Sequence, residues 1–396
     1  REGRTRAVTG KDGRAILVHV CGPRETDKAR ESLAELRELA RTAGVVVADT
    51  VLQARDRPDP KLVLGRGKLE DTVLRAMQLD AEVLIFDREL SPAQASAISK
   101  VSDLRVLDRT QLILDIFAQR ATSVDGKLQV ELAQTRYLLP RLGTRDDSLS
   151  RLTGGIGGRG PGETKLEIGK RRARERIATL EARLTRSTRQ REQRRHLRER
   201  RGVPVVAIVG YTNAGKSTLL NGLTGSEVLA ENKLFATLDP TSRRTFLVDR
   251  EIVLTDTVGF VRDLPKDLFA AFRATFEEAA DADVLLQVVD VSDPSCEEHM
   301  ATTEELLQEL GIAEIDRLLV LNKRDLAPAE HVENIAARHH GLPLCAHDQT
   351  SMKALRQHLF VALRASESLH QPTLSSSTSK INVDDGGIAP GKPLSP

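Results

Sequence analysis

The chain has 396 residues, of which 40% are hydrophobic and 29% are charged, a composition typical of a globular protein with two or three domains. No apolar run reaches the ~18 residues that a membrane-spanning helix needs, which excludes a protein with helical membrane spans. The three cysteines are scattered and form no disulfide or metal-ligand pattern, so we expect a protein of the reducing cytoplasm.

The net charge of +2 conceals an uneven distribution. Residues 165–201 contain 15 Lys and Arg but 5 Asp and Glu, and such a basic block favours a polyanionic partner. Aromatic residues make up only 3% of the chain, so contact with a nucleic-acid backbone or with RNA shape is a better interpretation than base stacking. The first residue is Arg1 rather than Met, and we expect residues to be missing before it.

The first third of the chain predicts a small α/β domain. Residues 1–13 are polar, and we expect them to be disordered. From 14 to 110, short apolar runs alternate with segments of helical periodicity, which indicates a mainly parallel sheet. A helix is predicted to begin at Ser91-Pro92, because Ser caps helices and Pro suits their first turn. The turn Gly65-Arg66-Gly67 lacks a third glycine and an acidic partner, so we interpret it as structural rather than nucleotide-binding.

Residues 111–201 are predicted to form an antiparallel helical hairpin. Apolar stripes over 112–121 and 128–140 indicate two helices, and a long helix with a sparse apolar seam follows them. Before that long helix, residues 154–162 contain six glycines and one proline, which cannot form regular structure. This glycine-rich loop is either a flexible linker or a phosphate contact made through Arg159.

The long helix is rich in arginine. A run of like charges is usually a solvated face, but its length and single sign favour nucleic-acid contact equally. Arginine is suited to bidentate contact with phosphate. The candidate RNA-binding residues are Arg159, Arg171, Arg172, Arg174 and Arg176.

Residues 202–366 predict a doubly wound α/β sheet whose site lies at the carboxyl ends of the strands. Residues 367–396 are rich in Ser, Thr, Gly and Pro, and we expect a disordered tail. The expected strands of the sheet lie near residues 203–209, 245–248, 252–255, 284–289, 318–321 and 343–345. The predicted fold class is therefore a P-loop α/β sheet preceded by a small α/β domain and a helical hairpin.

The first chemical signal is a match to G-x-x-x-x-G-K-[ST] between a strand and a helix. Its glycines let the backbone curl so that N–H groups surround phosphate oxygens, and the helix N-terminus adds its dipole. We expect Lys216 to reach the β- and γ-phosphates and the Ser217 hydroxyl to bind Mg²⁺. The predicted contacts are Gly210, Tyr211, Thr212, Asn213, Ala214, Gly215, Lys216, Ser217 and Thr218.

The second signal is Asp256-Thr257-Val258-Gly259, at the end of the strand at 252–255. The Asp256 carboxylate can hold Mg²⁺ through water, and the Gly259 N–H can meet the γ-phosphate. These four residues are predicted nucleotide contacts.

A mobile loop is expected between the phosphate loop and the strand at 245–248. Its best candidate for a Mg²⁺ ligand is Thr237, with Thr241 as the alternative. A loop held by Mg²⁺ and the γ-phosphate and released on hydrolysis would make a two-state switch. Lys216, Thr237 and Gly259 are thus the expected catalytic residues. The predicted nucleotide contacts of this loop are Phe235, Ala236, Thr237, Leu238 and Asp239.

The third signal specifies the base. In Asn322-Lys323-Arg324-Asp325, the Asp325 carboxylate can accept two hydrogen bonds from N1–H and the amino group of guanine, which adenine cannot supply. Lys323 can lie over the base, and Asn322 can tie this loop to the phosphate loop. Near Cys345-Ala346-His347, an N–H is expected to meet guanine O6. The order and spacing of the three signals predict a protein that binds GTP and GDP.

Taken together, these motifs resemble the HflX family of translation-factor-class GTPases, and the match extends over residues 14–365. It includes Asp108-Arg109-Thr110, Gly126-Lys127-Leu128-Gln129-Val130 and the glycine loop up to Thr164. Departures from the family pattern are Gly158 for Thr, Lys165 for Gln, Ile168-Gly169-Lys170 for Thr-Asp-Arg, and Cys345 for Ser.

The resemblance implies a ribosome-associated GTPase that binds the large ribosomal subunit and its rRNA and splits stalled or stressed ribosomes. The helical subdomain and the glycine loop are expected near rRNA, and we expect a cytoplasmic monomer. Two alternatives remain. One is a binding module in which the nucleotide only sets the affinity for the partner and hydrolysis acts as a timer. The other is a GTPase of ribosome assembly or RNA processing. Accumulation of precursor rRNA on deletion would favour the latter.

Two residues bear on the rate of hydrolysis. Phe260 stands where related GTPases carry a Gln that orients water, so we expect slow intrinsic hydrolysis that the ribosome stimulates. Asn213 stands where potassium-stimulated GTPases have an Asn that helps to hold K⁺ beside the phosphates. Equal rates in potassium and sodium buffers would exclude that second role.

Overall fold

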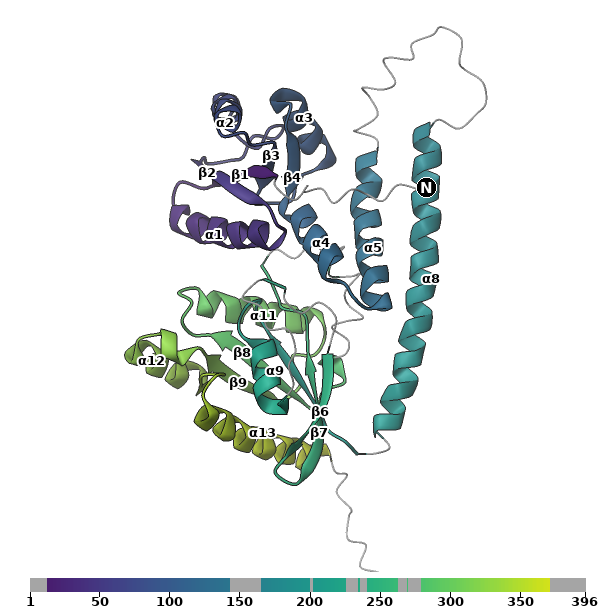
Figure 1. The fold of residues 1–396 in the computed structure, drawn as a ribbon, viewed down its shortest axis with the longest axis vertical. Coiled ribbons are helices and arrows are strands. Elements are labelled where there is room, and N and C mark those ends of the chain that lie inside the picture. Colours follow the sequence, from purple (N-terminus) through teal and green to yellow (C-terminus); the bar gives the residue numbers. More distant parts are fainter. Residues whose placement is uncertain are drawn as a thin grey trace, which may run out of the picture.

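The structure, a computed structural model, describes residues 13–142, 165–199, 202–225, 234–235, 241–262, 269 and 279–370. Figure 1 shows a small α/β unit, a pair of helices beside it and a larger α/β unit below. The predicted fold class is confirmed, since both α/β units contain sheets with parallel strands and the helices lie between them in sequence.

The N-terminal unit contains a four-stranded sheet in the order β2-β1-β3-β4, and all its pairs are parallel. Helix α1 packs on one face, while α2 and α3 cover the other. Because helices cover both faces, β3 is apolar and buried along its whole length. The elements are β1 (Arg14–Cys21), α1 (Thr26–Thr42), β2 (Val46–Ala54), α2 (Arg66–Gln78), β3 (Val83–Phe86), α3 (Pro92–Ser102) and β4 (Arg105–Asp108).

Side-chain caps define where the helices of this part begin. Ser91 and Gln94 form the reciprocal capping box of α3, with distances of 3.2 Å and 3.0 Å between the backbone nitrogens and the side-chain oxygens. The predicted start of this helix is therefore confirmed. The Gly65-Arg66-Gly67 turn opens α2, with Gly65 as the N-cap residue.

The middle of the chain is helical. Helix α4 (Arg109–Arg120) lies between the two α/β units, and α5 (Val124–Leu138) runs antiparallel to α8 (Lys165–Glu199), as Figure 1 shows. A short 3₁₀ helix, η1 (Leu139–Arg141), ends α5. The pair α5–α8 is joined at its seam by the buried Leu180 and on its surface by Arg176, which donates two hydrogen bonds to Glu131 at 2.6 and 2.7 Å.

The larger unit contains a six-stranded sheet in the order β10-β9-β8-β5-β7-β6, in which only β6 is antiparallel to its neighbour. Helices α9 and α13 pack on one face, and α11 and α12 on the other, so the sheet is doubly wound. The elements are β5 (Val205–Gly210), α9 (Lys216–Thr224), β6 (Thr241–Leu247), β7 (Arg250–Asp256), β8 (Val284–Asp290), α11 (Cys296–Glu309), β9 (Arg317–Asn322), η2 (Arg324–Leu326), α12 (Ala329–His339), β10 (Leu342–Pro343) and α13 (Gln349–His370).

The two α/β units share one hydrophobic core. Buried residues of α1 and α4 are continuous with one face of the larger sheet. At the junction, the ring of Phe117 on α4 meets the ring of Phe235 edge to face, with centroids 4.6 Å apart. The N-terminal unit is thus packed against the larger unit rather than joined to it only by a linker.

Several boundaries differ from the sequence-based expectation. Strand β6 begins at Thr241, earlier than expected, and Val248 lies outside it with a φ of 59°. The reason is a tight turn into the antiparallel strand β7, which residue patterning alone does not reveal. Helix α13 continues to His370, so the first residues of the expected disordered tail are helical.

Asp115 on α4 is half-buried, and one oxygen of its carboxyl group is fully buried. Its Oδ2 has no hydrogen-bond partner within the described ranges, which run from 13 to 370 with gaps. Burial raises the pKa of Asp115 to about 6, and the nearby charge of Arg105 opposes that rise only in part. Because the folded-state pKa is raised, ionisation of Asp115 destabilises the fold, and this penalty grows as the pH rises toward and through 6.

We expect Asp115→Asn to remove this penalty. The free energy of unfolding of the variant relative to the parent should rise by about 2 kcal/mol between pH 4 and pH 7.5, because only the parent acquires the buried charge. Urea denaturation at both pH values measures the change. Glu82→Gln, at an exposed position, is the control and should show no such rise. A stability difference independent of pH would contradict the prediction.

Candidate functional site

The site begins where β5 ends and α9 starts. Gly210 has a φ of 144°, and a Cβ there would lie 2.2 Å from the carbonyl oxygen of Val288 on β8. Gly215 has a φ of 95°, and a Cβ there would lie 2.3 Å from Nδ2 of Asn322. Both conformation and space therefore require glycine at these two positions of the motif. The predicted strand–loop–helix context of the phosphate-loop motif is present.

Lys216 is buried at the first position of α9. Its Nζ donates to the carbonyl oxygens of Gly210 at 3.1 Å and Tyr211 at 2.9 Å. Burial lowers the pKa of Lys216 to about 8, although the charge of Asp256 opposes this. The cation is thus held at the centre of the loop, where an anion would restore the charge balance.

Ser217 and Asp256 come together from separate elements. The Ser217 hydroxyl donates to Oδ2 of Asp256 at the end of β7, at 2.7 Å. A hydroxyl and a carboxylate are hard oxygen ligands of the kind that Mg²⁺ prefers. The pair therefore fits the divalent ion that P-loop GTPases typically use, with the carboxylate acting directly or through water.

Gly259 brings the second motif against the phosphate loop. A Cβ on Gly259 would lie 2.8 Å from Cα of Thr212 and 3.0 Å from Nζ of Lys216. The next residue, Phe260, forms backbone hydrogen bonds with both sides of the loop, to Gly210 at 3.1 Å and from Thr212 at 2.7 Å. The Phe260 side chain is buried, so this residue does not supply a polar group that could orient water.

Asn322 connects three loops. Its Nδ2 donates to the carbonyl oxygen of Ala214 at 2.9 Å, and its Oδ1 accepts from the N–H of Ala346 at 3.1 Å. Asn322 thus ties its own motif both to the phosphate loop and to the loop after β10, as the sequence suggested for the first of these contacts.

The neighbouring residues set the shape of the third motif. Lys323 has a φ of 61°, and its ammonium group pairs with Asp290 at the end of β8, at 2.7 Å. Burial raises the pKa of the Cys345 thiol, and a hydrogen bond to Asp325 adds to the rise. The Cys345 side chain therefore contacts the carboxylate that we expect to bind guanine, a contact that sequence reasoning missed because it considered only the backbone of this loop.

Some predicted residues lie outside the described part of the chain. These are Ala236, Thr237, Leu238 and Asp239 of the expected mobile loop and Arg159 of the glycine-rich loop. Phe235 is described: its N–H donates to the Thr212 hydroxyl at 2.9 Å, so the start of that loop touches the phosphate loop. Asn213 is exposed and has a φ of 61°.

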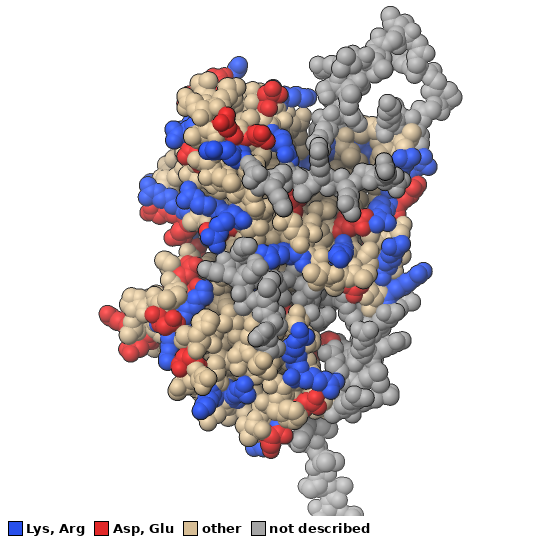
Figure 2. Space-filling view, viewed as in Figure 1, with Lys and Arg blue, Asp and Glu red and all other residues tan. Residues whose placement is uncertain are grey.

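The candidate RNA-binding arginines of α8 are not equivalent. Arg176 is paired with Glu131 of α5, and Arg171 lies 3.9 Å from Glu175. Arg172 and Arg174 are exposed and form no ion pair with another residue of the described ranges. Figure 2 shows Lys and Arg side chains along the upper half of α8.

Comparison with known families identifies all three parts of the chain. Residues 30–118 match the family described as GTP-binding GTPase N-terminal, residues 120–198 match its middle region, and residues 205–323 match the family described as 50S ribosome-binding GTPase.

A GTPase HflX of Lacrimispora saccharolytica is 52% identical over 317 residues, which are 80% of this chain and 75% of that protein. The chain belongs to the HflX family of GTPases. The GTPase HflX of Caldanaerobacter subterraneus is 48% identical over 79% of this chain and 73% of its own. The GTPase HflX of Escherichia coli is 48% identical over the same shares of the two chains.

HflX proteins are ribosome-associated GTPases that split ribosomes under stress, so this chain is a GTPase of that class.

A GTP-binding protein of Sulfolobus solfataricus, solved with GDP, is 24% identical, with a TM-score of 0.45 over 89% of this chain and 99% of that one. No helix in the described part of the molecule has both the length and the apolar character needed to cross a membrane.

We expect Asn322→Ala to weaken the binding of GDP and of a GTP analogue by similar factors, at least tenfold. The substitution leaves the Ala214 carbonyl and the Ala346 N–H without a buried partner, which costs about 1–3 kcal/mol for each group. Fluorescence titration with labelled nucleotides measures both affinities. Asn322→Asp keeps the acceptor for the Ala346 N–H but places an oxygen against the Ala214 carbonyl oxygen, so it should weaken the binding of both nucleotides at least as strongly. Weakened binding of only one nucleotide would contradict this role.

Proposed function

We propose that this HflX protein binds GTP with Asp325 on guanine and the phosphate loop on the triphosphate, and hydrolyses it to GDP. The contact that supports this most directly is the double hydrogen bond of Asn322, because it sets the spacing between the loop for phosphate and the two loops for the base. A site with that spacing can contact both the base and the phosphates of one nucleotide.

Each residue of the site has its own proposed role. Lys216 binds the β- and γ-phosphates, and the Gly259 N–H binds the γ-phosphate. Ser217 and Thr237 would hold Mg²⁺, with Asp256 acting through water, and the ion would supply neutralisation of the phosphate charge. Asn213 would help to hold a K⁺ ion beside the phosphates. Because Phe260 is buried and apolar, hydrolysis by the isolated protein is slow, and binding to the ribosome accelerates it.

The partner that fits the basic helix is the large ribosomal subunit with its rRNA. Arg172 and Arg174 are exposed on α8 and available for phosphate, whereas Arg176 stabilises the helix pair. We propose that the protein acts as a cytoplasmic monomer, and the free thiols of Cys21, Cys296 and Cys345 fit a reducing compartment.

The boundaries proposed for the working parts follow the sequence: 14–110, 111–201 and 202–366, with the glycine-rich loop 154–162 in the second. The loop lies between α5 and α8 in the chain, outside the described residues, and its Arg159 is a proposed contact with RNA.

We expect Asp325→Asn to convert a GTP site into a site for xanthosine triphosphate. The amide can donate to the carbonyl at C2 of xanthine but repels the amino group of guanine, so GTP affinity should fall about 100-fold while affinity for the xanthine nucleotide rises. Competition titration with both nucleotides measures the change. ATP affinity, which does not use this carboxylate, is the control. An unchanged preference for GTP would remove Asp325 from the site.

We expect the double variant Arg172→Glu/Arg174→Glu to bind the large ribosomal subunit at least tenfold more weakly, because it replaces two phosphate-binding cations by anions. Co-sedimentation with purified 50S subunits, in a GTP analogue and in GDP, measures binding. The plot of log affinity against log salt should become shallower by roughly 1–2.

The matched control for this experiment is Arg172→Lys/Arg174→Lys, which keeps the charge and should bind in the GTP-analogue state nearly as the parent does. A single-turnover assay in the same samples should show subunit-stimulated hydrolysis by the parent. If the charge-reversed variant sedimented like the parent, α8 would not be the RNA contact. If the subunits left the parent's rate unchanged, the proposed stimulation would be wrong.

A further inference from the structure

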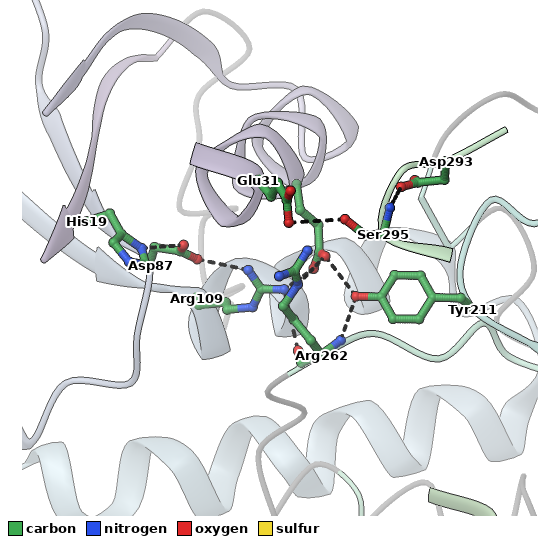
Figure 3. A network of polar contacts seen from close by, with 9 residues as sticks. His19, Glu31, Asp87, Arg109, Tyr211, Arg262, Asp293 and Ser295 are labelled. Atoms are coloured by element: carbon green, nitrogen blue, oxygen red, sulfur yellow. Dashed lines mark hydrogen bonds and ion pairs between the residues drawn. The ribbon is translucent and has the colours of Figure 1, made fainter. Parts of the chain in front are cut away.

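One carboxylate of the N-terminal unit contacts two parts of the nucleotide site. Glu35 lies on α1, and its side chain is 10% exposed. Its partners Arg109, Tyr211 and Arg262 lie close together in Figure 3. Its oxygens accept from the Tyr211 hydroxyl at 2.7 Å and from Nε of Arg262 at 2.8 Å. They also accept from Arg109. Three donors thus converge on one anion at the junction of the two units.

The N-terminal side of this cluster is fixed in position. Arg109 is buried, and its Nη1 donates to Oδ1 of Asp87 at 2.8 Å. Oδ2 of Asp87 in turn lies 2.7 Å from Nδ1 of His19 on β1. Burial would raise the pKa of Asp87, but the hydrogen bond from His19 and the charge of Arg109 outweigh it and lower that pKa. Asp87 therefore stays ionised, and Glu35 is anchored to the first sheet through Arg109.

The other side of the cluster belongs to the site. Tyr211 is the second residue of the phosphate-loop motif, and its ring stacks on His299 of α11 with centroids 3.8 Å apart. Burial, and then the charge of Glu35, raise the pKa of Tyr211, so its hydroxyl remains a donor. The same hydroxyl accepts from the backbone N–H of Arg262 at 2.9 Å.

Arg262 follows Gly259 by three residues, in a stretch whose Gly259 and Phe260 lie against the phosphate loop. Gly259 lies so close to Thr212 and Lys216 that no side chain fits between them, and Lys216 donates to carbonyl groups of its own loop. Room for a γ-phosphate between Lys216 and Gly259 therefore requires a displacement of the lysine or of the 259–262 stretch. The contacts of Arg262 with Glu35 and Tyr211 oppose a displacement of that stretch.

We propose that Glu35 is a positioning residue of the GTPase site, which holds Tyr211 and Arg262 in the arrangement that favours GDP over GTP. The proposal rests on the proposed roles of Lys216 and Gly259. It makes the packing of the N-terminal unit and the bound nucleotide thermodynamically linked: GTP weakens the junction at Glu35, and an intact junction weakens GTP binding by the same factor.

A purely structural ion pair would behave differently. Breaking it would lower stability, but it would change the affinities for GDP and for GTP by the same factor or not at all. The ratio of the two affinities therefore distinguishes a positioning role of Glu35 from a purely structural role.

The test uses the full chain and Glu35→Gln, which keeps the shape of the side chain and removes its charge. Titration with fluorescently labelled GDP and with a labelled non-hydrolysable GTP analogue gives both dissociation constants. We expect the ratio of analogue affinity to GDP affinity to rise about tenfold, within the range typical of coupling between sites. An unchanged ratio, or a shift toward GDP, would overturn the proposal.

The matched control is Glu31→Gln, one turn earlier on α1. Glu31 accepts from the Ser295 hydroxyl at 3.1 Å across the same junction but contacts neither Tyr211 nor Arg262 within the described ranges, so its ratio should equal that of the parent. Binding of both nucleotides by the parent tests the proposed function, and the Glu35→Gln ratio tests only the positioning role.

Tyr211→Phe provides an independent variant, since it removes a single hydroxyl group and leaves Glu35 paired with both arginines. It should shift the ratio in the same direction by a smaller factor. In the double variant with Glu35→Gln, the combined shift should be less than the product of the two, because both act through one contact. Full multiplicativity would show that Tyr211 and Glu35 act separately and would contradict the proposal.

Discussion

The site depends on the close approach of three loops at one edge of a sheet, and the Asn322 amide holds them there. Its two hydrogen bonds reach the phosphate loop at Ala214 and the last loop at Ala346. The approach is possible because Gly215 has no side chain where Asn322 lies. A glycine and an amide far apart in sequence thus set the distance between the proposed positions for phosphate and base.

The same edge is connected to the rest of the molecule. The core continues from the larger sheet through Phe235 and Phe117 into the N-terminal unit, and Glu35 adds a polar contact beside it. Apolar packing stabilises the junction without requiring a particular orientation of the side chains, whereas hydrogen bonds between charged groups require one geometry. A displacement of Arg262 therefore weakens the polar contact before it disturbs the apolar one.

Charge is distributed differently at the junction of the two units and on α8. At the junction each arginine faces a carboxylate in a buried or half-buried setting, so the charges neutralise one another. On α8, Arg172 and Arg174 face outward. The first arrangement suits positioning inside the protein, and the second suits a polyanion outside it. Under the proposed function, the nucleotide site and the ribosomal contact lie in different parts of the chain, so the protein uses both arrangements.

The sequence by itself determined the class of both sheets, the helical pair, the three nucleotide motifs and the family, because each depends on local spacing along the chain. It also indicated the link from Asn322 to the phosphate loop. Only the tertiary structure decided that Arg176 is paired with Glu131, that the Cys345 thiol meets Asp325, and that Glu35, Arg109, Tyr211 and Arg262 form one cluster. Glu35 and Arg262 are 227 residues apart, and no local pattern encodes which charged groups meet when two units pack.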